Sequence, residues 1–432
     1  MTPIGEVLTM YKDQVDRDKV DFADLQPITI HFDGSTDKRK VEAGREYRMT
    51  LYFAHPGDIV VAKIDLKNGA VGIVPDWENV VVTNHFATYK PDRTKLVPEY
   101  LMLLIQTTFF KNYLWHNKVG AEGRKEVKLD FFESIPIPLP PLDTQRAIVA
   151  RWQAAQAEIA EMKTTIARQE QTLHQDMLAA LDIQQIDDSQ RPKTFALMWS
   201  QVERWSVEYL SRMVIGANEV HTGKYQTLPL GEVCDGQSGG TPYKKNPDFW
   251  DGDIPWVSPK DMKTEELEDS QDHITQHAID SSSAPLIPAP SILVVVRSGI
   301  LQRIVPIALN RVPVSINQDM RAFTPKDEQQ LLAEFLACYL DARQPALLRL
   351  VKWSTTVQSI NKEELEGFPI PLPPLDIQRA IVARVQAGRA AIARLREQAA
   401  HRAHTAQAEV EAAILGLPQQ QTKPDRFTKC LE

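Results

Sequence analysis

A stretch of 16 residues occurs twice in this chain. "PIPLPPLDTQRAIVAR" runs from Pro136 to Arg151, and "PIPLPPLDIQRAIVAR" runs from Pro369 to Arg384. The two copies differ only at Thr144 and Ile377, and they lie 233 residues apart, a period far too long for a solenoid repeat. The chain of 432 residues therefore contains a duplicated module of domain size.

Each copy predicts an extended segment followed by a long helix. Proline lacks an amide hydrogen and moves the preceding residue toward extended conformations, so "PIPLPPL" cannot be helical. Asp143 and Asp376 then stand where a helix N-cap is favoured. The apolar positions that follow alternate at spacings of four and three, which is the repeat of a left-handed coiled coil. The seam residues expected to pair the helices or to dock a partner are Ile148, Trp152, Ile159, Met162, Ile166, Ile381, Val385, Ile392 and Leu395.

The segments before the two copies correspond in pattern, although not in identity. Each has a β-branched strand ending in a basic residue, a polar strand with an asparagine, and an amphipathic helix. The corresponding ranges are 55–64 and 289–298, 83–91 and 316–325, and 98–107 and 333–342. The fold class is therefore α+β. We expect two mixed domains in tandem, each followed by a long helix, with the helices pairing as an antiparallel coiled coil of pseudo-twofold symmetry.

The duplication also sets the expected domain boundaries. A first globular domain covers 1–142 and a first helix covers 143–183. A linker with the second globular domain covers 184–375, the second helix covers 376–416, and a tail covers 417–432.

Composition indicates a cytoplasmic protein rather than a secreted or membrane-bound one. The N-terminus has no apolar signal segment, and the longest purely apolar run, Ile292–Val296, is far below the roughly 20 residues of a membrane span. Cys234, Cys338 and Cys430 are scattered, as in proteins of a reducing compartment. The net charge of −8 does not by itself indicate a nucleic-acid binder, but binding depends on where the basic residues gather.

The chain resembles the specificity subunit of a type I restriction-modification system. Two differing globular domains, each ending in "IPLPPL" with a glutamine and a long helix, are typical of that family. The second domain adds "GGTP" at Gly239–Pro242, Trp250, Gly252 and "IPW" at Ile254–Trp256, which is similar to the opening of many target recognition domains. The first domain lacks this opening, and only its later half follows the pattern.

The resemblance implies a non-catalytic subunit. Its two target recognition domains would each read one part of a bipartite, asymmetric site on double-stranded DNA. The paired helices would set the spacing and dock two methyltransferase subunits, which use S-adenosylmethionine, and a nuclease and motor subunit that uses ATP and Mg²⁺ can join. This chain itself would bind no cofactor and no metal.

Candidate DNA contacts follow from residue type and from acid-free or glycine-containing loops. Lysine and arginine suit phosphate and guanine, while small polar side chains let the backbone approach closely. In the first domain the candidates are Lys38, Arg39, Lys40, Arg124, Lys125 and Lys128. In the second they are Thr241, Lys244, Lys245, Ser258, Lys260, Lys352, Ser354, Thr355, Thr356 and Gln358. Trp250 and Trp256 are expected in the core rather than against bases.

Two other functions remain open at this stage. Asp92, Glu126 and Lys128 form a degenerate PD…ExK pattern, which would make the chain a self-contained nuclease using a divalent metal. Alternatively, the chain is a coiled-coil scaffold whose globular domains bind proteins and not DNA. "HITQH" at His273–His277 lacks the glutamate of a zinc protease motif, so no metal site is expected there.

Overall fold

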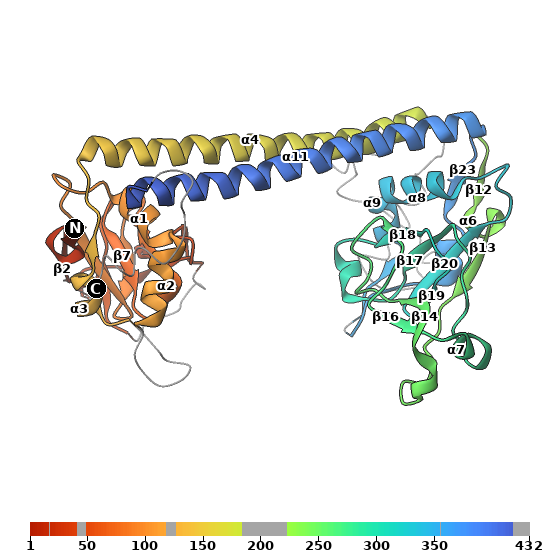
Figure 1. The fold of residues 1–432 in the computed structure, drawn as a ribbon, viewed down its shortest axis with the longest axis horizontal. Helices are drawn as coiled ribbons and strands as arrows, with labels where there is room; N and C mark the ends of the chain where they lie inside the picture. Colours follow the sequence, from red (N-terminus) through yellow and green to blue (C-terminus); the bar gives the residue numbers. More distant parts are fainter. Residues whose placement is uncertain (17, 41–48, 118–126, 184–222, 355, 418–432) are drawn as a thin grey trace. The chain divides into compact units, whose positions relative to one another are not determined.

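The residues of the chain gather into two compact units. The computed structural model describes residues 1–16, 18–40, 49–117, 127–183, 223–354 and 356–417. Unit 1 comprises Met1–Thr164 with Leu395–Glu432, and unit 2 comprises Thr165–Arg394 (Figure 1). Among the described residues, none of the helices is both long and apolar enough to cross a membrane.

The described part of unit 1 is built on a four-stranded sheet, a five-stranded sheet and short helices. The strands of its four-stranded sheet are, in spatial order, β2 (Leu8–Tyr11), β10 (Phe86–Pro91), β7 (Ile59–Ala62) and β8 (Val71–Ile73). Its second sheet has the order β3 (Asp13–Gln14), β6 (Leu51–Phe53), β9 (Val80–Thr83), β4 (Gln26–Ile30) and β5 (Thr36–Lys38). The helices are α1 (Pro98–Gln106), α2 (Thr108–His116) and α3 (Leu129–Ser134), followed by the long helix α4 (Leu142–Ala180).

Unit 2 has a corresponding set of elements. The strands of its five-stranded sheet are β13 (Cys234–Ser238), β20 (Met320–Pro325), β17 (Ser291–Val295), β18 (Ile307–Asn310) and β15 (Glu266–Leu267). A three-stranded sheet has the order β16 (Asp272–Ile274), β14 (Trp250–Val257) and β19 (Ser315–Ile316), and β21 (Val351–Lys352) pairs with β22 (Ser359–Ile360). The helices are α6 (Leu230–Val233), α7 (Gln276–Ser281), α8 (Ala333–Ala342), α9 (Gln344–Arg349), α10 (Lys362–Glu366) and the long α11 (Leu375–Leu415).

The central four strands follow one plan in both units. The orders β2-β10-β7-β8 and β13-β20-β17-β18 match, and every pairing within them is antiparallel. The inner strands β7 and β17 are buried because their β-branched residues face the core on both sides of the sheet. The predicted α+β class and the strand and helix correspondence between the two modules are confirmed.

The proline-rich half of each repeated stretch is extended, as predicted, and it closes its own domain. β11 (Pro136–Ile137) pairs with β1 (Thr2–Pro3), and β23 (Pro369–Pro371) pairs with β12 (Thr227–Pro229). In each unit, the start of the domain therefore lies beside its end. A sequence signal matches this arrangement: "PIGEV" at Pro3–Val7 and "PLGEV" at Pro229–Val233 are also copies of one segment.

A fully buried glutamine fixes the start of each long helix. Gln145 accepts a hydrogen bond from the amide of Val97 at 2.8 Å and donates to the carbonyls of Lys95 and Pro140, both at 2.8 Å. Its counterpart, Gln378, makes the equivalent three bonds at 2.8–2.9 Å in unit 2, to Leu332, Gln330 and Pro373. Val97 and Leu332 are the N-cap residues of α1 and α8. In each unit, one amide side chain therefore connects the long helix, the extended proline-rich segment before it (the strap) and the start of α1 or α8.

The first turn of each long helix differs from the prediction in one detail. α4 begins at Leu142 and α11 begins at Leu375, so Asp143 and Asp376 lie inside the first turn and not at the N-cap. The Pro141 carbonyl accepts from the amide of Gln145 at 3.1 Å, and Asp143 instead pairs with Arg146 at 3.0 Å. An acidic residue in the first turn still interacts favourably with the helix dipole.

The long helices pair antiparallel within each unit, as predicted. In unit 1, Glu158 of α4 pairs with Arg402 of α11 at 2.6 Å. In unit 2, Asp176 of α4 pairs with Arg384 of α11 at 2.5 Å. The seam of α11 includes a glycine, Gly388, where the two helices pack closely. A Cβ at Gly388 would lie 2.7 Å from Cδ1 of Leu173.

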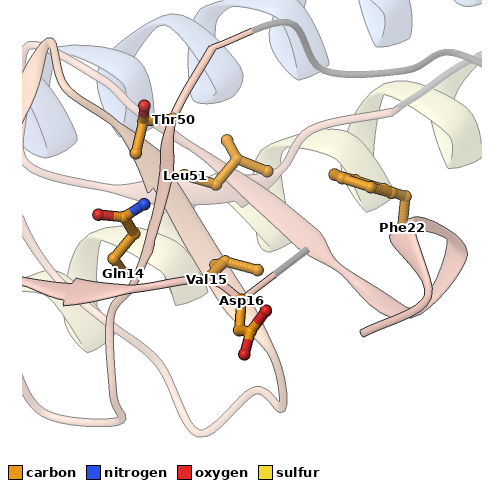
Figure 2. Close-up of a pocket in the computed structure, with 6 residues that line it drawn as sticks. All are labelled: Gln14, Val15, Asp16, Phe22, Thr50 and Leu51. Atoms are coloured by element: carbon orange, nitrogen blue, oxygen red, sulfur yellow. The ribbon is translucent and has the colours of Figure 1, made fainter. Parts of the chain in front are cut away.

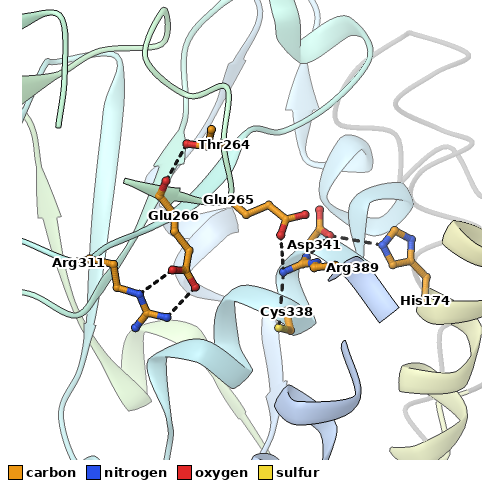
Figure 3. A network of polar contacts seen from close by, with 8 residues as sticks. All are labelled: His174, Thr264, Glu265, Glu266, Arg311, Cys338, Asp341 and Arg389. Carbon is orange, nitrogen blue, oxygen red and sulfur yellow. Dashed lines mark hydrogen bonds and ion pairs between the residues drawn. The ribbon is translucent and has the colours of Figure 1, made fainter. Parts of the chain in front are cut away.

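A polar network attaches both helices to the globular part of unit 2 (Figure 3). Arg389 of α11 contacts Asp341 and Glu265, each at 2.8 Å, and His174 of α4 lies 3.4 Å from the same Asp341 carboxylate. Burial by itself would raise the pKa of Asp341, but hydrogen bonding and charge from His174 and Arg389 outweigh burial and hold that pKa below its usual range. Nearby, Arg311 joins Glu266 at 2.6 Å and Glu334 at 2.8 Å.

We expect Gln145→Ala to lower the free energy of unfolding by about 2–4 kcal/mol, because it removes the three hydrogen bonds made by this fully buried side chain. Urea unfolding of the full chain measures this loss. Gln153 lies exposed on the same helix, so Gln153→Ala is the matched control and should change stability little. Equal losses in the two variants would show that the buried amide has no special role.

We expect the stabilising effect of Asp341 to depend on pH. The folded-state pKa of its carboxyl is depressed, so its contribution is present above the unfolded pKa of about 4 and is lost as the pH falls through the folded-state value. Asp341→Asn should therefore cost about 1–3 kcal/mol at neutral pH and progressively less in acid. A cost that stays constant between about pH 7 and pH 3 would contradict this assignment.

Candidate nucleic-acid interface

Four segments of unit 2 that are distant in sequence meet at one polar edge. The hydroxyl of Thr241 donates to the side-chain oxygen of Gln318, in the turn between β19 and β20. In the same turn, Asp319 accepts from Nε of Arg297 at 2.6 Å. The amide of Ser298 donates to the Gln358 carbonyl at 3.1 Å, which places the loop after β21 beside the end of β17. Thr241 and the 352–358 stretch, both predicted, therefore border the same surface.

The two glycines of the "GGTP" opening allow this convergence. A Cβ on Gly239 would lie 1.9 Å from the carbonyl oxygen of Asn317, and one on Gly240 would lie 2.3 Å from that of Ser283. Real side chains never approach backbone so closely, so only glycine fits at either position. The indole Nε1 of Trp256 donates to the Gly240 carbonyl at 3.0 Å. The Trp256 ring packs edge to face with the Trp250 ring, with 5.3 Å between the ring centroids. Trp256 is buried in a small hydrophobic cluster, as expected, and the partly buried Trp250 packs against that cluster.

The predicted cations of unit 2 differ in how far they are engaged. Lys244 and Lys245 are exposed in the loop before β14. By contrast, Lys260 pairs with Asp272 at 2.7 Å, and this hydrogen bond raises the pKa of its ammonium group. Lys352 is half-buried, with its ammonium 3.4 Å from Glu364.

The predicted small polar residues divide in the same way. Ser354 and Thr356 are exposed and their hydroxyls lie 3.1 Å apart, whereas Thr355 lies outside the described residues. Ser258 is buried because its hydroxyl and amide both bond to Asp261. Gln358 is also buried, at 5% exposure, and its amide reaches the Ser354 carbonyl at 3.4 Å. Neither Ser258 nor Gln358 presents its side chain to solvent.

In unit 1, Lys38, Arg39 and Lys40 are exposed at the end of the edge strand β5. The Lys38 ammonium lies 5.3 Å from the centre of the Trp77 ring, a cation–π distance. Lys128 is exposed immediately before α3. Arg124 and Lys125 lie outside the described residues.

The structure adds basic residues that the sequence analysis did not select. Lys63 follows β7 as Arg297 follows β17, and both lie against the turn that leads into β10 or β20. Lys63 donates to the carbonyl of Asn84 at 2.7 Å. The alignment of 55–64 with 289–298, each ending in a base, was the signal that could have identified them.

The seam residues are mostly buried by helix pairing. Ile148 and Trp152 pack with Val410 and Ile414 of α11 in the core of unit 1. Ile381 and Val385 do the same in unit 2, with Met177 and Leu178 of α4. Of the predicted set, Ile148, Ile159, Ile166, Ile381, Val385 and Ile392 are buried, and Trp152, Met162 and Leu395 are partly buried.

The nuclease pattern finds no geometric support in the described part of the chain. Asp92 accepts from the hydroxyl and amide of Thr94, at 2.6 and 3.0 Å, and hydrogen bonding to Thr94 lowers its pKa. Glu126 lies outside the described residues. No group of three or more potential metal ligands occurs among those described.

Two further features do not point to catalysis. A hollow of about 430 Å³ in unit 1 is lined by Gln14, Val15, Asp16, Phe22, Thr50 and Leu51, and none of these described lining residues is basic (Figure 2). Burial raises the pKa of the Cys234 thiol to about 12 and that of Cys338 to about 11, which keeps both thiols protonated and unreactive.

Comparisons with known proteins give one family. The model of the type I restriction modification DNA specificity domain matches residues 3–170 and 223–398. The EcoR124I/EcoR124II specificity subunit of Escherichia coli is 41% identical over 162 residues, which are 37% of this chain and 40% of that relative. The HindI specificity subunit of Haemophilus influenzae is 24% identical over 374 residues, covering 74% of this chain and 78% of the relative.

A solved structure shares the fold. Its chain, described under "Structural basis underlying complex assembly and conformational transition of the type I R-M system", aligns with a TM-score of 0.61 at 21% identity, covering 96% of both chains. Each of the two family matches contains one copy of the repeated stretch. The chain therefore belongs to the type I restriction-modification DNA specificity family, and it carries two copies of the specificity domain.

Proposed function

We propose that this chain is the sequence-recognition subunit of a type I restriction-modification complex. Each unit reads one part of a bipartite, asymmetric target in double-stranded DNA. The observation that carries this proposal is that the two units share their internal framework but differ in their exposed residues. The glutamine contacts and the central strands are equivalent in the two units, whereas the exposed residues at corresponding edges differ.

The contrast is clearest at β2 and β13, which occupy the same place in the strand order. Thr9 and Met10 are exposed on β2, and the corresponding positions on β13 carry Asp235 and Gly236. Differences confined to exposed positions do not affect the core, so they indicate two recognition surfaces with different preferences. A site read by two different surfaces is asymmetric.

The proposed contacts are the candidates at these edges that are at least partly exposed. In unit 2 they are Thr241, Lys244, Lys245, Ser354 and Thr356, with Arg297 added from the structure. Lys260, Lys352 and Arg297 contribute less, because acidic residues already engage them. In unit 1 the proposed contacts are Lys38, Arg39, Lys40, Lys63 and Lys128.

The remaining parts of the proposal concern partners. Two methyltransferase subunits dock on the paired helices, and a nuclease and motor subunit can join them. S-adenosylmethionine, ATP and Mg²⁺ belong to those subunits, so this chain performs no chemistry itself. We place the complex in the cytoplasm, where cellular DNA is accessible.

We expect Lys244→Ala to weaken DNA binding and to reduce the salt dependence of affinity by about one unit of slope, since one phosphate contact is lost. Titrations of the assembled complex at several salt concentrations measure this slope. Lys260→Ala is the matched control, because its ammonium already pairs with Asp272 at 2.7 Å. An unchanged slope for Lys244→Ala would remove this lysine from the interface.

We also expect the methylated motif in cells that carry the complete operon to have two specific parts separated by an unspecific spacer. Single-molecule sequencing of modified bases reads this motif directly. A continuous or palindromic motif would contradict the proposal that two different domains each read one part of the target.

Two other assays test the alternative functions. A scaffold would add no sequence preference to its partners in a mobility-shift assay, and a self-contained nuclease would cleave DNA with Mg²⁺ and no partner.

A further inference from the structure

Unit 1 contains a small notch at the end of the edge strand β2, with a volume of about 40 Å³. Met10, Tyr52 and Phe86 supply apolar surface to it. Lys12, Lys63 and Asn84 supply polar groups to the same lining. Four separate segments therefore place apolar carbon, two cations and one amide around a space that can hold a group the size of a water molecule.

Hydrogen bonds hold the walls of this notch in place. Tyr11, which also lines it, donates its hydroxyl to Asp58, and Asp58 is 3% exposed and accepts the amide of His55 at 2.7 Å. The Tyr11 ring stacks on the His55 ring with an interplanar angle of 5°. Burial, the larger cause, and the hydrogen bond to Asp58 both raise the pKa of Tyr11, so its hydroxyl stays protonated and remains a donor.

The turn beside the notch is equally defined. The Lys63 ammonium donates to the Asn84 carbonyl at 2.7 Å, which ties the end of β7 to the turn between β9 and β10. Asn84 itself is exposed, so its side-chain amide faces solvent at the rim. Lys12 is also exposed.

The fold does not require a hollow at this position. In unit 2, the chain that leaves the corresponding strand, β13, packs directly on the equivalent turn. Gly239 and Gly240 donate their amides to Met320 at 3.2 Å and to Ile316 at 2.9 Å. In unit 1, the chain leaving β2 turns away at Asp13 to pair with β6, and the space stays open.

We propose that this notch receives the 5-methyl group of a thymine, while Asn84 bonds an adenine on the same major-groove edge. Unit 1 thereby reads at least one T·A pair. A methyl group is about the size of a water molecule, and it favours contact with aromatic and thioether carbon. Asparagine matches the N6 and N7 groups of adenine, and the flanking lysines suit phosphate. The proposal rests on the proposed function and specifies the chemistry that one of its two readers recognises.

The first test removes only the methyl group. Each thymine of the methylated motif is replaced in turn by uracil, and the affinity of the full chain in complex with its methyltransferase subunits is measured. We expect one replacement to lower affinity about three- to fivefold, the effect of one buried carbon. Scanning every thymine means that the part read by unit 1 need not be known beforehand.

The variant Met10→Ala connects this effect to the notch. Met10 is 46% exposed, so the substitution should leave the fold intact. We expect it to weaken binding of the thymine duplex and to abolish the difference between thymine and uracil. Ile300 is 43% exposed in unit 2, and Ile300→Ala is the matched control that should retain the difference.

Asn84→Ala gives a second, independent test. Replacing one adenine by 7-deazaadenine, which lacks the N7 acceptor, should lower the DNA affinity of the unmodified chain about tenfold. The same replacement should hardly change the affinity of the Asn84→Ala variant, which has already lost this contact. The proposal is overturned if no thymine responds to uracil, or if Met10→Ala still distinguishes the two bases. A complex without any sequence preference would instead overturn the proposed function, so the two failures are distinguishable.

Discussion

The buried amides of Gln145 and Gln378 are the contacts on which the arrangement of this protein most depends. Each one is fully buried and bonds two carbonyls and one amide of the segments around it. Because these groups belong to the strap, the domain and the long helix, the bonds hold together only when all three elements are in place. A long helix that leaves its domain through such a contact has a defined direction, which a flexible proline-rich linker would not provide. The repeated stretch thus fixes the direction in which each long helix leaves its domain.

The second constraint is that unit 1 does not complete its core from contiguous sequence. Val410 and Ile414, near the end of the described chain, pack with Ile148 and Trp152 in unit 1. Glu411 accepts the amide of Thr108 at 2.7 Å, at the start of α2. An apolar seam on a single helix cannot remain in water, so antiparallel pairing buries it and brings the end of the chain to the first domain. The two halves of the sequence are therefore coupled in folding.

Recognition in this design depends on positions that the frame leaves unconstrained. The net charge of −8 gives no indication of a DNA-binding protein, yet exposed lysines gather at strand ends in both units. The corresponding edge is closed by two glycines in unit 2 and remains open in unit 1. Backbone packing at one turn thus changes the shape of a surface without changing the fold, which is how one frame can carry two different preferences.

The sequence by itself determined the duplication, the extended strap, the two helices and the register of their seams, because proline geometry and helical periodicity are local properties. It also indicated the strand plan, through the matched ranges 55–64 and 289–298. Only the tertiary structure decided which candidate side chains are available. Ser258 and Lys260 are typical DNA-contact residues in a list, but Asp261 and Asp272 engage them. Lys63 and Asn84 were not selected from the sequence, and they border a notch formed by four separate segments. Side-chain availability depends on which residues meet across strands, and that pairing is a non-local property of the folded chain.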